Sequence, residues 1–596
     1  MIKLSDYVVQ FIASRGVKHV FMLPGGGAMH LDDSLGRCKD IQFVCNLHEQ
    51  ACAVAAEAYA RITNNIGVAL VTSGPGGTNT ITGVAGAWQD STPCLFISGQ
   101  VKRADMIGDS GVRQVGLQEI DIIPIVSSIT KYAVTVLDPT CIRYHLEKAE
   151  YLATSGRPGP AWVDIPLDVQ AAMIEPDDLR GFEPAPLDPP RIQDEVARAI
   201  ELLNEADRPV LLAGNGIRLA GAQADFLNMV DQLGIPVQTS RLGVDLIPHS
   251  HKLCFGSPGH IAPRGANFTI QNADWVLILG ARLDTFLTAY APDRLARAAT
   301  KVVVDIDPSE IRRLGKIASV PICADLRLFF REFFRLLPKV KPKDRSAWLG
   351  RCRDWKARYP FVLPEHFNGG KYLSMYAFSA VLSDELASDD IVLSGSSGVA
   401  ADIFSTALEV KAGQRVFFNK GTSAMGLAQP AAIGACLAGG GRRVVCVDGD
   451  GGFQLNIQEL ETVRRLGLPI KFFVINNQGY AMIRQSQGTH FKRLTGADAS
   501  SGLTLPDVTE VAAAYGLDTA RISSVGDLKE QVRRVLDRPE PIVCEVIVDP
   551  DEVRAPRVST VVRPDGSIVS KPLEDMWPFL DRDEFRANMI IPPLEE

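Results

Sequence analysis

The segment that most constrains the fold is a Gly-Asp-Gly turn between two apolar stretches. Residues 443–448 and 470–475 are largely apolar runs of the length of a buried strand, and residues 457–466 carry apolar side chains at helical spacing. Gly467 and Pro469 then end the predicted helix. A strand, a helix and a second strand in this order form a parallel crossover. The segment therefore predicts an open α/β sheet with parallel strands.

Two oxygen-bearing side chains directly follow these predicted strands. Asp450, at the centre of the turn, follows the first strand, and Asn477 follows the second. Because open parallel sheets bind ligands at the carboxyl ends of their strands, both residues are expected at one edge of the sheet. A carboxylate, an amide oxygen and the free backbone carbonyl of Gly479 are hard oxygen ligands, which suit octahedral Mg²⁺ beside a bound diphosphate. The spacing therefore predicts a magnesium site made by Asp450, Asn477 and Gly479.

This Gly-Asp-Gly and Asn-Asn pair resembles the signature of the thiamine diphosphate (ThDP) enzymes. A lone Gly-Asp-Gly is usually only a turn, but the predicted strand, helix and strand around it supply the context that the signature requires. The resemblance implies that the chain binds ThDP together with Mg²⁺. It also implies cofactor contacts by Gly449, Gly451, Gly452 and Tyr480.

Length, charge and cysteine pattern exclude several other classes of protein. A chain of 596 residues is too long for one core. Its formal net charge of −8 argues against a nucleic-acid surface, which needs a basic footprint. The eleven cysteines include no Cys-x-x-Cys pair, which favours buried thiols in a reducing cytoplasm over disulfides or zinc. The longest small-apolar run, 425–441, contains a proline and glycines, so we expect a buried helix rather than a membrane span.

Strand and helix patterns alternate in three regions, and the resemblance gives each region a role. The alternation predicts three parallel-sheet α/β domains in series. They are a pyrimidine-binding domain over 1–178, a central FAD- or nucleotide-type domain over 190–340, and a diphosphate- and magnesium-binding domain over 370–550. A proline- and acid-rich stretch, 175–190, is the predicted linker between the first two. The tail, 551–596, is apolar enough to cover an active site.

The first domain is expected to supply the acid that ThDP chemistry requires. A carboxyl group hydrogen-bonded to the pyrimidine N1′ favours the imino tautomer, whose 4′-nitrogen removes the proton at C2. Glu49 opens an alanine-rich helix in a His-Glu-Gln…Ala-Arg segment that resembles the acetohydroxyacid (acetolactate) synthases, in which this Glu activates the cofactor. Taken alone, Glu49 would equally suit a helix N-terminus by its charge. The same resemblance implies that Gln118 lies in the active site and that the loop containing Gly26 approaches C2.

In the third domain the resemblance implies a bulky apolar side chain that keeps the cofactor bent. Met425 lies in a segment similar to the family's Gly-x-Met-Gly…Pro-Ala-Ala run, so it is the expected wedge, although a single methionine is more often core filler. The carbonyl of Ser423 is then expected to hold the 4′-amino group. Ser396 and Ser397 stand where family members carry a Gly-Gln-His loop, and they are expected to contact the diphosphate.

The central domain carries motifs that resemble the FAD-binding domain of the acetohydroxyacid synthases. Gly214 and Gly216 follow one predicted strand, and Arg282, Asp305 and Asp325 follow later ones. The resemblance implies that these residues bind FAD, which is structural in that family, whereas related decarboxylases keep similar motifs without flavin. Arg282 is expected on the flavin or on the carboxylate of a second keto acid, because a guanidinium binds phosphate and carboxylate in bidentate fashion.

Two positions depart from the family where the acceptor substrate is selected. Ser486 stands where branched-chain acetohydroxyacid synthases carry a Trp, and Leu167 replaces a Lys of the same channel. Losing an aromatic wall and a cation makes room for a larger acceptor. The expected function is a ThDP-dependent carboligase that decarboxylates pyruvate or another 2-keto acid. The hydroxyethyl unit passes to a second pyruvate or to a larger ketone such as a keto-sugar nucleotide.

Other functions stay open at this point. One is a ThDP-dependent decarboxylase or lyase of the oxalyl- or hydroxyacyl-CoA type, although the chain lacks a clear basic patch for coenzyme A. Another is a flavin-dependent oxidoreductase or a non-catalytic nucleotide-binding subunit, although the presence of Glu49, Asp450 and Asn477 argues against an inactive paralogue. By family resemblance the active site lies between two chains, so the expected assembly is a homodimer or homotetramer.

Overall fold

The first domain is built on a six-stranded parallel sheet. The computed structural model describes residues 1–186, 188–562 and 568–594. The strands are β2 (His19–Met22), β3 (Gln42–Cys45), β4 (Gly67–Val71), β5 (Cys94–Gln100), β6 (Tyr132–Thr135) and β7 (Pro160–Pro166), in the order β3-β2-β4-β5-β7-β6. The α-helices are α1 (Leu4–Ser14), α2 (Met29–Arg37), α3 (Glu49–Thr63), α4 (Pro75–Gln89), α5 (Ile122–Val126), α6 (Ile142–Thr154) and α7 (Leu167–Gln170). Near its two ends, β1 (Ile2–Lys3) pairs antiparallel with β8 (Met173–Ile174).

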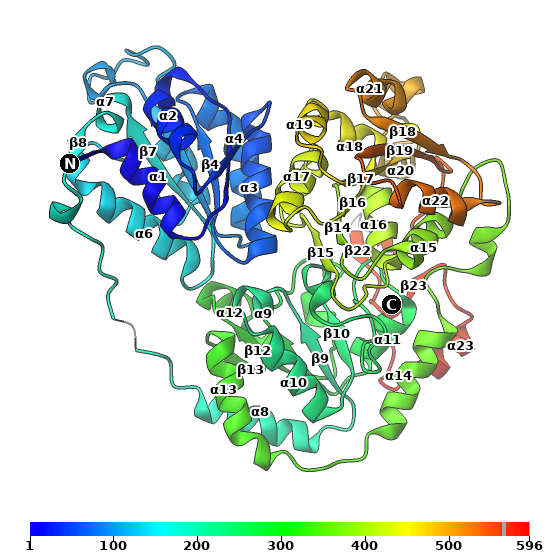
Figure 1. Cartoon of the computed structure of the whole chain (residues 1–596). Helices are drawn as coiled ribbons and strands as arrows, with labels where there is room; N and C mark the ends of the chain where they lie inside the picture. Colours follow the sequence, from blue (N-terminus) through cyan, green and yellow to red (C-terminus); the bar gives the residue numbers. More distant parts are fainter. Residues whose placement is uncertain (187, 563–567, 595–596) are drawn as a thin grey trace.

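The central domain has a five-stranded parallel sheet. Its strands are β9 (Pro209–Ala213), β10 (Val237–Thr239), β11 (Trp275–Leu279), β12 (Thr300–Asp305) and β13 (Val320–Cys323), in the order β10-β9-β11-β12-β13. Its helices are α8 (Gln193–Glu205), α9 (Gly216–Leu219), α10 (Gln223–Leu233), α11 (Arg264–Gln271), α12 (Pro308–Leu314), α13 (Leu326–Leu336) and α14 (Ser346–Arg358). The described part of the predicted linker runs outside the sheets to α8 (Figure 1).

The third domain repeats the six-stranded architecture of the first. Its strands are β14 (Ile391–Ser394), β15 (Arg415–Phe418), β16 (Val444–Gly449), β17 (Ile470–Asn476), β18 (Asp518–Ile522) and β19 (Ile542–Ile547), in the order β15-β14-β16-β17-β19-β18. Its helices are α15 (Met375–Glu385), α16 (Gly398–Ala407), α17 (Ala428–Ala438), α18 (Asp450–Gln454), α19 (Glu459–Leu466), α20 (Ala481–His490), α21 (Val508–Ala514) and α22 (Leu528–Leu536). Three domains with parallel sheets confirm the predicted fold class.

The predicted helix at 457–466 differs in its start, because a left-handed residue interrupts the chain after α18. Asn456 has φ +78°. Its side chain is tied to two other segments, since Nδ2 donates to Oε1 of Gln50 (2.9 Å) and to the carbonyl of Gly426 (2.8 Å). The helix therefore begins at Glu459 as α19. It ends as predicted, with Gly467 in the left-handed conformation.

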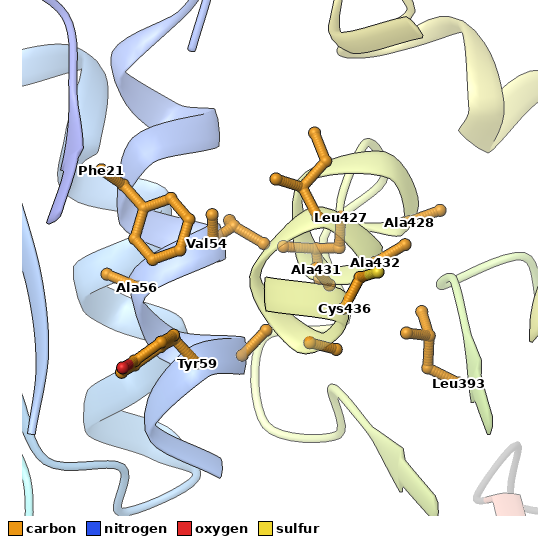
Figure 2. Close-up of a cluster of buried hydrophobic side chains, with 14 of the residues drawn as sticks. Phe21, Val54, Ala56, Tyr59, Leu393, Leu427, Ala428, Ala431, Ala432 and Cys436 are labelled. Atoms are coloured by element: carbon orange, nitrogen blue, oxygen red, sulfur yellow. The ribbon is translucent and has the colours of Figure 1, made fainter. Parts of the chain in front are cut away.

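The first and third domains are joined by two alanine-rich helices, α3 and α17 (Figure 2). In Figure 2, Val54 of α3 faces Leu427 and Ala431 on the α17 side. The helix backbones approach closely at Gly434, where a Cβ atom would lie 2.1 Å from the carbonyl oxygen of Ala55. The predicted buried helix within 425–441 is α17, and no helix in the described ranges is long and apolar enough to cross a membrane.

The first residues of the tail contact the third domain, where Arg554 pairs with Asp402, and from β20 on its described part lies against the central domain. Its elements are β20 (Arg557–Val558), β21 (Thr560–Val562), β22 (Ile568–Ser570), β23 (Met576–Trp577) and α23 (Arg582–Asn588). Met576 and Phe585 are buried in one apolar cluster with Phe268 and Trp355. The side chain of Asn588 accepts a hydrogen bond from Nε1 of Trp355 (2.9 Å). A role of the tail in covering the active site stays a prediction.

Candidate functional site

Asp450 and Asn477 meet at one edge of the third sheet, where the neighbouring strands β16 and β17 end. The carboxylate of Asp450 accepts hydrogen bonds from the N–H groups of Gly451 (2.8 Å) and Gly479 (2.9 Å). Oδ1 of Asn477 is buried and has no hydrogen-bond partner in the described parts of the chain. A buried oxygen without a partner is costly unless a ligand satisfies it. The structure thus brings the predicted ligands Asp450, Asn477 and Gly479 together.

These donors fit a hard cation such as Mg²⁺. Burial raises the pKa of Asp450 to about 6, so a cation would stabilise the charged carboxylate that burial disfavours. Across residues 1–186, 188–562 and 568–594, no group of three or more His, Cys, Asp or Glu side chains could hold a metal. A single carboxylate beside an amide oxygen suits Mg²⁺, which keeps water and phosphate oxygens as further ligands.

Side chains of neighbouring loops fill the space around the glycines of this turn. A Cβ atom at Gly451 would lie 2.2 Å from the ring of Tyr480. At Gly449 and Gly452 it would lie 2.6 and 2.7 Å from the side chain of Ser397. The three glycines, Tyr480 and Ser397, all predicted to contact the cofactor, therefore lie together at the end of β16.

Ser397 and Asp448 form a buried pair that the sequence analysis missed. Oγ of Ser397 donates a hydrogen bond to Oδ1 of Asp448 and accepts one from the N–H of Gly449 (2.7 Å). Burial raises the pKa of Asp448 to about 7. A Cβ atom at Gly395 would lie 2.2 Å from the Asp448 carboxyl group, so the two loops fit closely. An Asp at the end of a buried strand, directly before the Gly-Asp-Gly turn, is the signal that would have found it.

The two predicted serine contacts consequently differ. The hydroxyl of Ser397 is engaged within the protein, whereas Oγ of Ser396 is buried and has no hydrogen-bond partner in the described segments. Ser396 is therefore the hydroxyl of this loop that is available to a ligand.

Ser423 and Met425 lie in an irregular loop between β15 and α17. Ser423 has φ +48° and Gly426 has φ +86°. A Cβ atom at Gly426 would lie 2.5 Å from the carbonyl oxygen of Leu455, so only glycine fits there. Met425 is half-buried, in contrast to the fully buried residues of the core. A left-handed serine is uncommon, and such strain often marks a loop that is shaped for a ligand.

Glu49 lies at the start of α3 with 7% of its surface exposed. Its Oε2 accepts a hydrogen bond from Nδ2 of Asn79 on α4 (2.9 Å). His48 caps the helix by accepting a hydrogen bond from the N–H of Gln50 (3.1 Å). The carboxyl group thus lies buried at the start of the alanine-rich helix α3.

The other two predicted catalytic residues lie in exposed parts of the first domain. Gln118 has φ +61°. The neighbouring Glu119 is buried and holds this loop, since its carboxylate accepts hydrogen bonds from the N–H groups of Val115 (3.0 Å) and Gly116 (3.1 Å). Gly26 begins a short 3₁₀ turn with open space on its Cβ side.

Within one chain, the start of α3 is linked to the loop that carries Met425. Gln50, next to Glu49, accepts the hydrogen bond from Asn456, and Asn456 also donates to the carbonyl of Gly426. The structure therefore brings Glu49's helix and the Met425 loop into one network. Completion of the active site by a second chain stays a prediction.

A cavity of about 410 Å³ lies where the three domains meet. Four of the predicted FAD residues line it: Gly216, Arg282, Asp305 and Asp325. Gly214 supports it indirectly, because a Cβ atom there would lie 2.1 Å from the carbonyl oxygen of Gly280 and would separate the ends of β9 and β11. The volume is within the range of small-molecule and cofactor sites.

The cavity has a cationic, aromatic wall that no sequence motif predicts. Lys420 and Arg241 lie over the ring of Phe286, at 3.5 and 4.5 Å from its centroid. All three residues line the cavity. No local pattern marks Lys420, because it comes from the third domain and reaches the cavity only through tertiary packing.

The chain matches three family models of thiamine pyrophosphate enzymes. They describe the N-terminal TPP binding domain (residues 2–125), the central domain (196–333) and the C-terminal TPP binding domain (395–546). The chain is 32% identical to an acetolactate synthase large subunit of Cyanidium caldarium, with 93% of this chain and 94% of the relative covered. It is 30% identical to a probable acetolactate synthase large subunit of Methanocaldococcus jannaschii, with 92% of both covered. The chain therefore belongs to the thiamine pyrophosphate enzymes, in the acetolactate synthase-like branch of ThDP-dependent carboligases.

Proposed function

We propose that this protein decarboxylates a 2-keto acid, foremost pyruvate, and joins the hydroxyethyl unit to a carbonyl acceptor, with Mg²⁺ and FAD besides ThDP. The acceptor is a second pyruvate, which gives acetolactate, or a larger ketone such as a keto-sugar nucleotide. The observation that carries the proposal is the unsatisfied amide oxygen of Asn477 beside the buried carboxylate of Asp450. Both lie in a domain that matches the C-terminal TPP binding domain.

Asp450, Asn477 and the carbonyl of Gly479 would hold Mg²⁺ in this proposal. The hydroxyl of Ser396 and the backbone of the Gly-Asp-Gly turn would bind the diphosphate. When bound, ThDP would supply a nucleophilic carbon for the keto group and a thiazolium ring that takes up the electron pair left behind when CO₂ departs. The protein's contribution at this end is binding and orientation, which depend on glycines that leave no room for side chains.

Glu49 would hold a proton at the pyrimidine nitrogen N1′. Asn79 occupies Oε2 of this carboxyl group at 2.9 Å, which fixes its orientation and leaves Oε1 for the ligand. Because Glu49 is buried, little water competes for this hydrogen bond. Met425 would support the bent cofactor, and the carbonyl of Ser423 would accept a hydrogen bond from the 4′-amino group. Gln118 and Gly26 would face the substrate.

FAD is proposed for the cavity between the domains. Gly216, Arg282, Asp305 and Asp325 line this cavity, and a phosphate would suit the guanidinium of Arg282. Asp305 ends β12 and Asp325 lies just after β13, and the carboxyl end of a strand is the usual place for acidic residues that bind a ribose. We expect purified protein to be yellow, with a flavin spectrum that does not bleach during turnover. A colourless and fully active preparation would exclude FAD.

The acceptor specificity is proposed from Ser486 and Leu167. Ser486 is exposed on α20, and Leu167 is half-buried at the start of α7. A serine and a neutral leucine leave more room, and less positive charge, than a tryptophan and a lysine would. This supports an acceptor that is larger than pyruvate.

We propose a homodimer or homotetramer in which the first domain of one chain and the third domain of another share each ThDP. The test mixes two strongly impaired variants, Glu49→Gln and Asp450→Ala, under conditions that allow subunit exchange. Partial recovery of activity is expected, since some mixed dimers contain one intact site. An inactive mixture with demonstrated exchange contradicts the shared site.

The eleven cysteines are unpaired, which supports a reducing, cytoplasmic location.

The decisive experiment incubates the purified protein with pyruvate, ThDP and Mg²⁺ and identifies the products by mass spectrometry. Acetolactate, or a hydroxyethyl adduct of an added ketone, is the expected product. Acetaldehyde alone would instead indicate a decarboxylase, and cleavage of oxalyl- or hydroxyacyl-CoA would indicate a lyase. Omitting Mg²⁺ tests the metal, because the reaction should then stop.

A further inference from the structure

Most cations that line the cavity between the domains are already paired with carboxylates. Arg157 lies 2.9 Å from Asp307, and Arg327 lies 2.8 Å from Asp325. Arg241 contacts Asp402 at 3.3 Å.

Arg282 and Lys420 are different. In the described parts of the chain, their side-chain nitrogens have no hydrogen bond and no ion pair. The ammonium group of Lys420 lies over the Phe286 ring, and burial lowers its pKa to about 8. Lys420 is half-buried, and Asp402, Asp284 and Asp90 act on it without a direct ion pair, so an anion from a ligand would stabilise its ammonium group.

The backbone of Lys420 is held firmly by the first domain. The carboxylate of Asp90 accepts hydrogen bonds from the N–H groups of Lys420 (3.0 Å) and Gly421 (2.9 Å). Asp90 is itself buried and paired with Arg61 at 2.7 Å. The Lys420 side chain therefore extends into the cavity from a fixed base.

Lys420 also begins the loop that carries the predicted ThDP contacts Ser423 and Met425. Oγ of Ser423 donates a hydrogen bond to the carbonyl of Lys420 (3.1 Å). At its other end the loop is fixed by the hydrogen bond from Asn456 to the carbonyl of Gly426. One short loop thus connects the cavity to the place proposed for the bent cofactor.

We propose that Lys420 binds an anionic group of a phosphate-bearing nucleotide in the cavity between the domains, and that the loop from Lys420 to Gly426 thereby links occupancy of this cavity to ThDP affinity. The link rests on the proposed position of ThDP at Met425. An anion on Lys420 would favour one position of its side chain and, through the Lys420 carbonyl that accepts the hydrogen bond from Ser423, the loop conformation to which ThDP would bind. By thermodynamic reciprocity, ThDP tightens nucleotide binding by the same factor.

The test uses full-length protein freed of flavin and measures the Kd of ThDP by calorimetry in excess Mg²⁺, with and without saturating FAD. ADP replaces FAD in a second series. In the unmodified protein, we expect saturating FAD to tighten ThDP binding about fivefold or more, the lower end of typical coupling. Lys420→Met should remove this difference, and Lys420→Arg should keep it.

Arg282→Met is the matched control, because Arg282 also faces the cavity but lies outside the loop. It should weaken FAD binding, yet at saturating FAD the tightening of ThDP binding should persist. The proposal would be overturned if FAD tightened ThDP binding equally in the unmodified protein and in a folded Lys420→Met variant. It would also be overturned if neither FAD nor ADP bound to the protein. If ADP binds and tightens ThDP binding but FAD does not, the proposal for Lys420 stands and FAD is removed from the proposed function. The product assay tests the carboligase separately.

Discussion

The first and third domains share one sheet topology, but the proposed function gives them different roles. Counted within each domain, the strand orders β3-β2-β4-β5-β7-β6 and β15-β14-β16-β17-β19-β18 are the same. Helix α3 follows β3, and α17 follows β15, so the helices that pack together between the domains are topologically equivalent. The two domains can therefore be compared position by position.

The two domains differ at the start of these equivalent helices. In the first domain the helix opens with the buried acid Glu49, oriented by Asn79. In the third domain a left-handed loop with Met425 precedes the helix. One strand further, β4 leads into α4, which carries Asn79, whereas β16 leads into Asp450. In the proposed function, the first domain would activate the cofactor and the third domain would hold it.

The largest effect that would test this division is expected from Asp450→Ala. The variant loses the only carboxylate of the proposed magnesium site, so Mg²⁺ and the diphosphate lose their shared anchor. We expect turnover to fall by about a thousandfold or more, because cofactor binding itself is lost. Calorimetry with ThDP and Mg²⁺ checks this, with Asp450→Asn separating charge from shape. Retained ThDP affinity in Asp450→Ala would break the assignment of binding to the third domain.

Glu49→Gln should show the opposite pattern. Without the proton held at N1′, turnover should fall by about a hundredfold, the scale of lost acid–base participation. The Kd of ThDP should change little, because the diphosphate and metal contacts remain. Measuring kcat and the Kd of ThDP in both variants tests whether activation and binding belong to different domains. Equal loss of binding in both variants would show that activation and binding are not separable between the domains.

Local patterns predicted the third-domain turn well. Asp450 and Asn477 were predictable because each directly follows an apolar strand, and parallel strands that cross over once must end side by side. The acid Glu49 was predictable for a similar reason, since it opens an alanine-rich helix. The strand order of the two six-stranded sheets was not predicted, because it depends on pairings between distant segments. The shared topology became visible only in the structure.

Contacts between segments that lie far apart were beyond the sequence analysis. Ser397 was predicted to face the diphosphate, yet the structure pairs its hydroxyl with Asp448, which no motif assigned. Lys420 was not considered at all, since its neighbours Phe286 and Asp90 come from two other domains. Nothing in the residues around Lys420 encodes those neighbours, and only the packing of three domains brings them together.

A smaller effect should separate the two serines of the third domain. Ser396→Ala removes a hydroxyl that has no partner in the described parts of the chain, so folding stability should be unchanged and ThDP affinity should fall about tenfold. Ser397→Ala leaves the buried Asp448 without its hydroxyl donor, at a cost of about 1–3 kcal/mol in the free energy of unfolding. Denaturant unfolding and ThDP calorimetry on both variants check this. The reverse pattern would show that Ser397 is the residue facing the ligand.

The smallest expected effect concerns pH and the cavity that borders both domains. Burial lowers the pKa of Lys420 to about 8, so its ammonium group is mostly charged at pH 7 and mostly neutral at pH 9. The charged groups that face it are Arg241, Asp402, Asp284 and Asp90. Guanidinium and carboxylate groups do not ordinarily titrate between pH 7 and 9, so Lys420 is the group that changes.

Affinity for FAD should consequently fall by about fivefold from pH 7 to pH 9, since a neutral lysine no longer attracts a phosphate. Lys420→Arg should flatten this dependence, because its guanidinium stays charged. Fluorescence titration of FAD at several pH values measures both curves. A pH dependence that is identical in Lys420→Arg would place the titrating group elsewhere. The affinity for FAD would then depend on the central domain alone, and Lys420 would not link the cavity to the third domain through its charge.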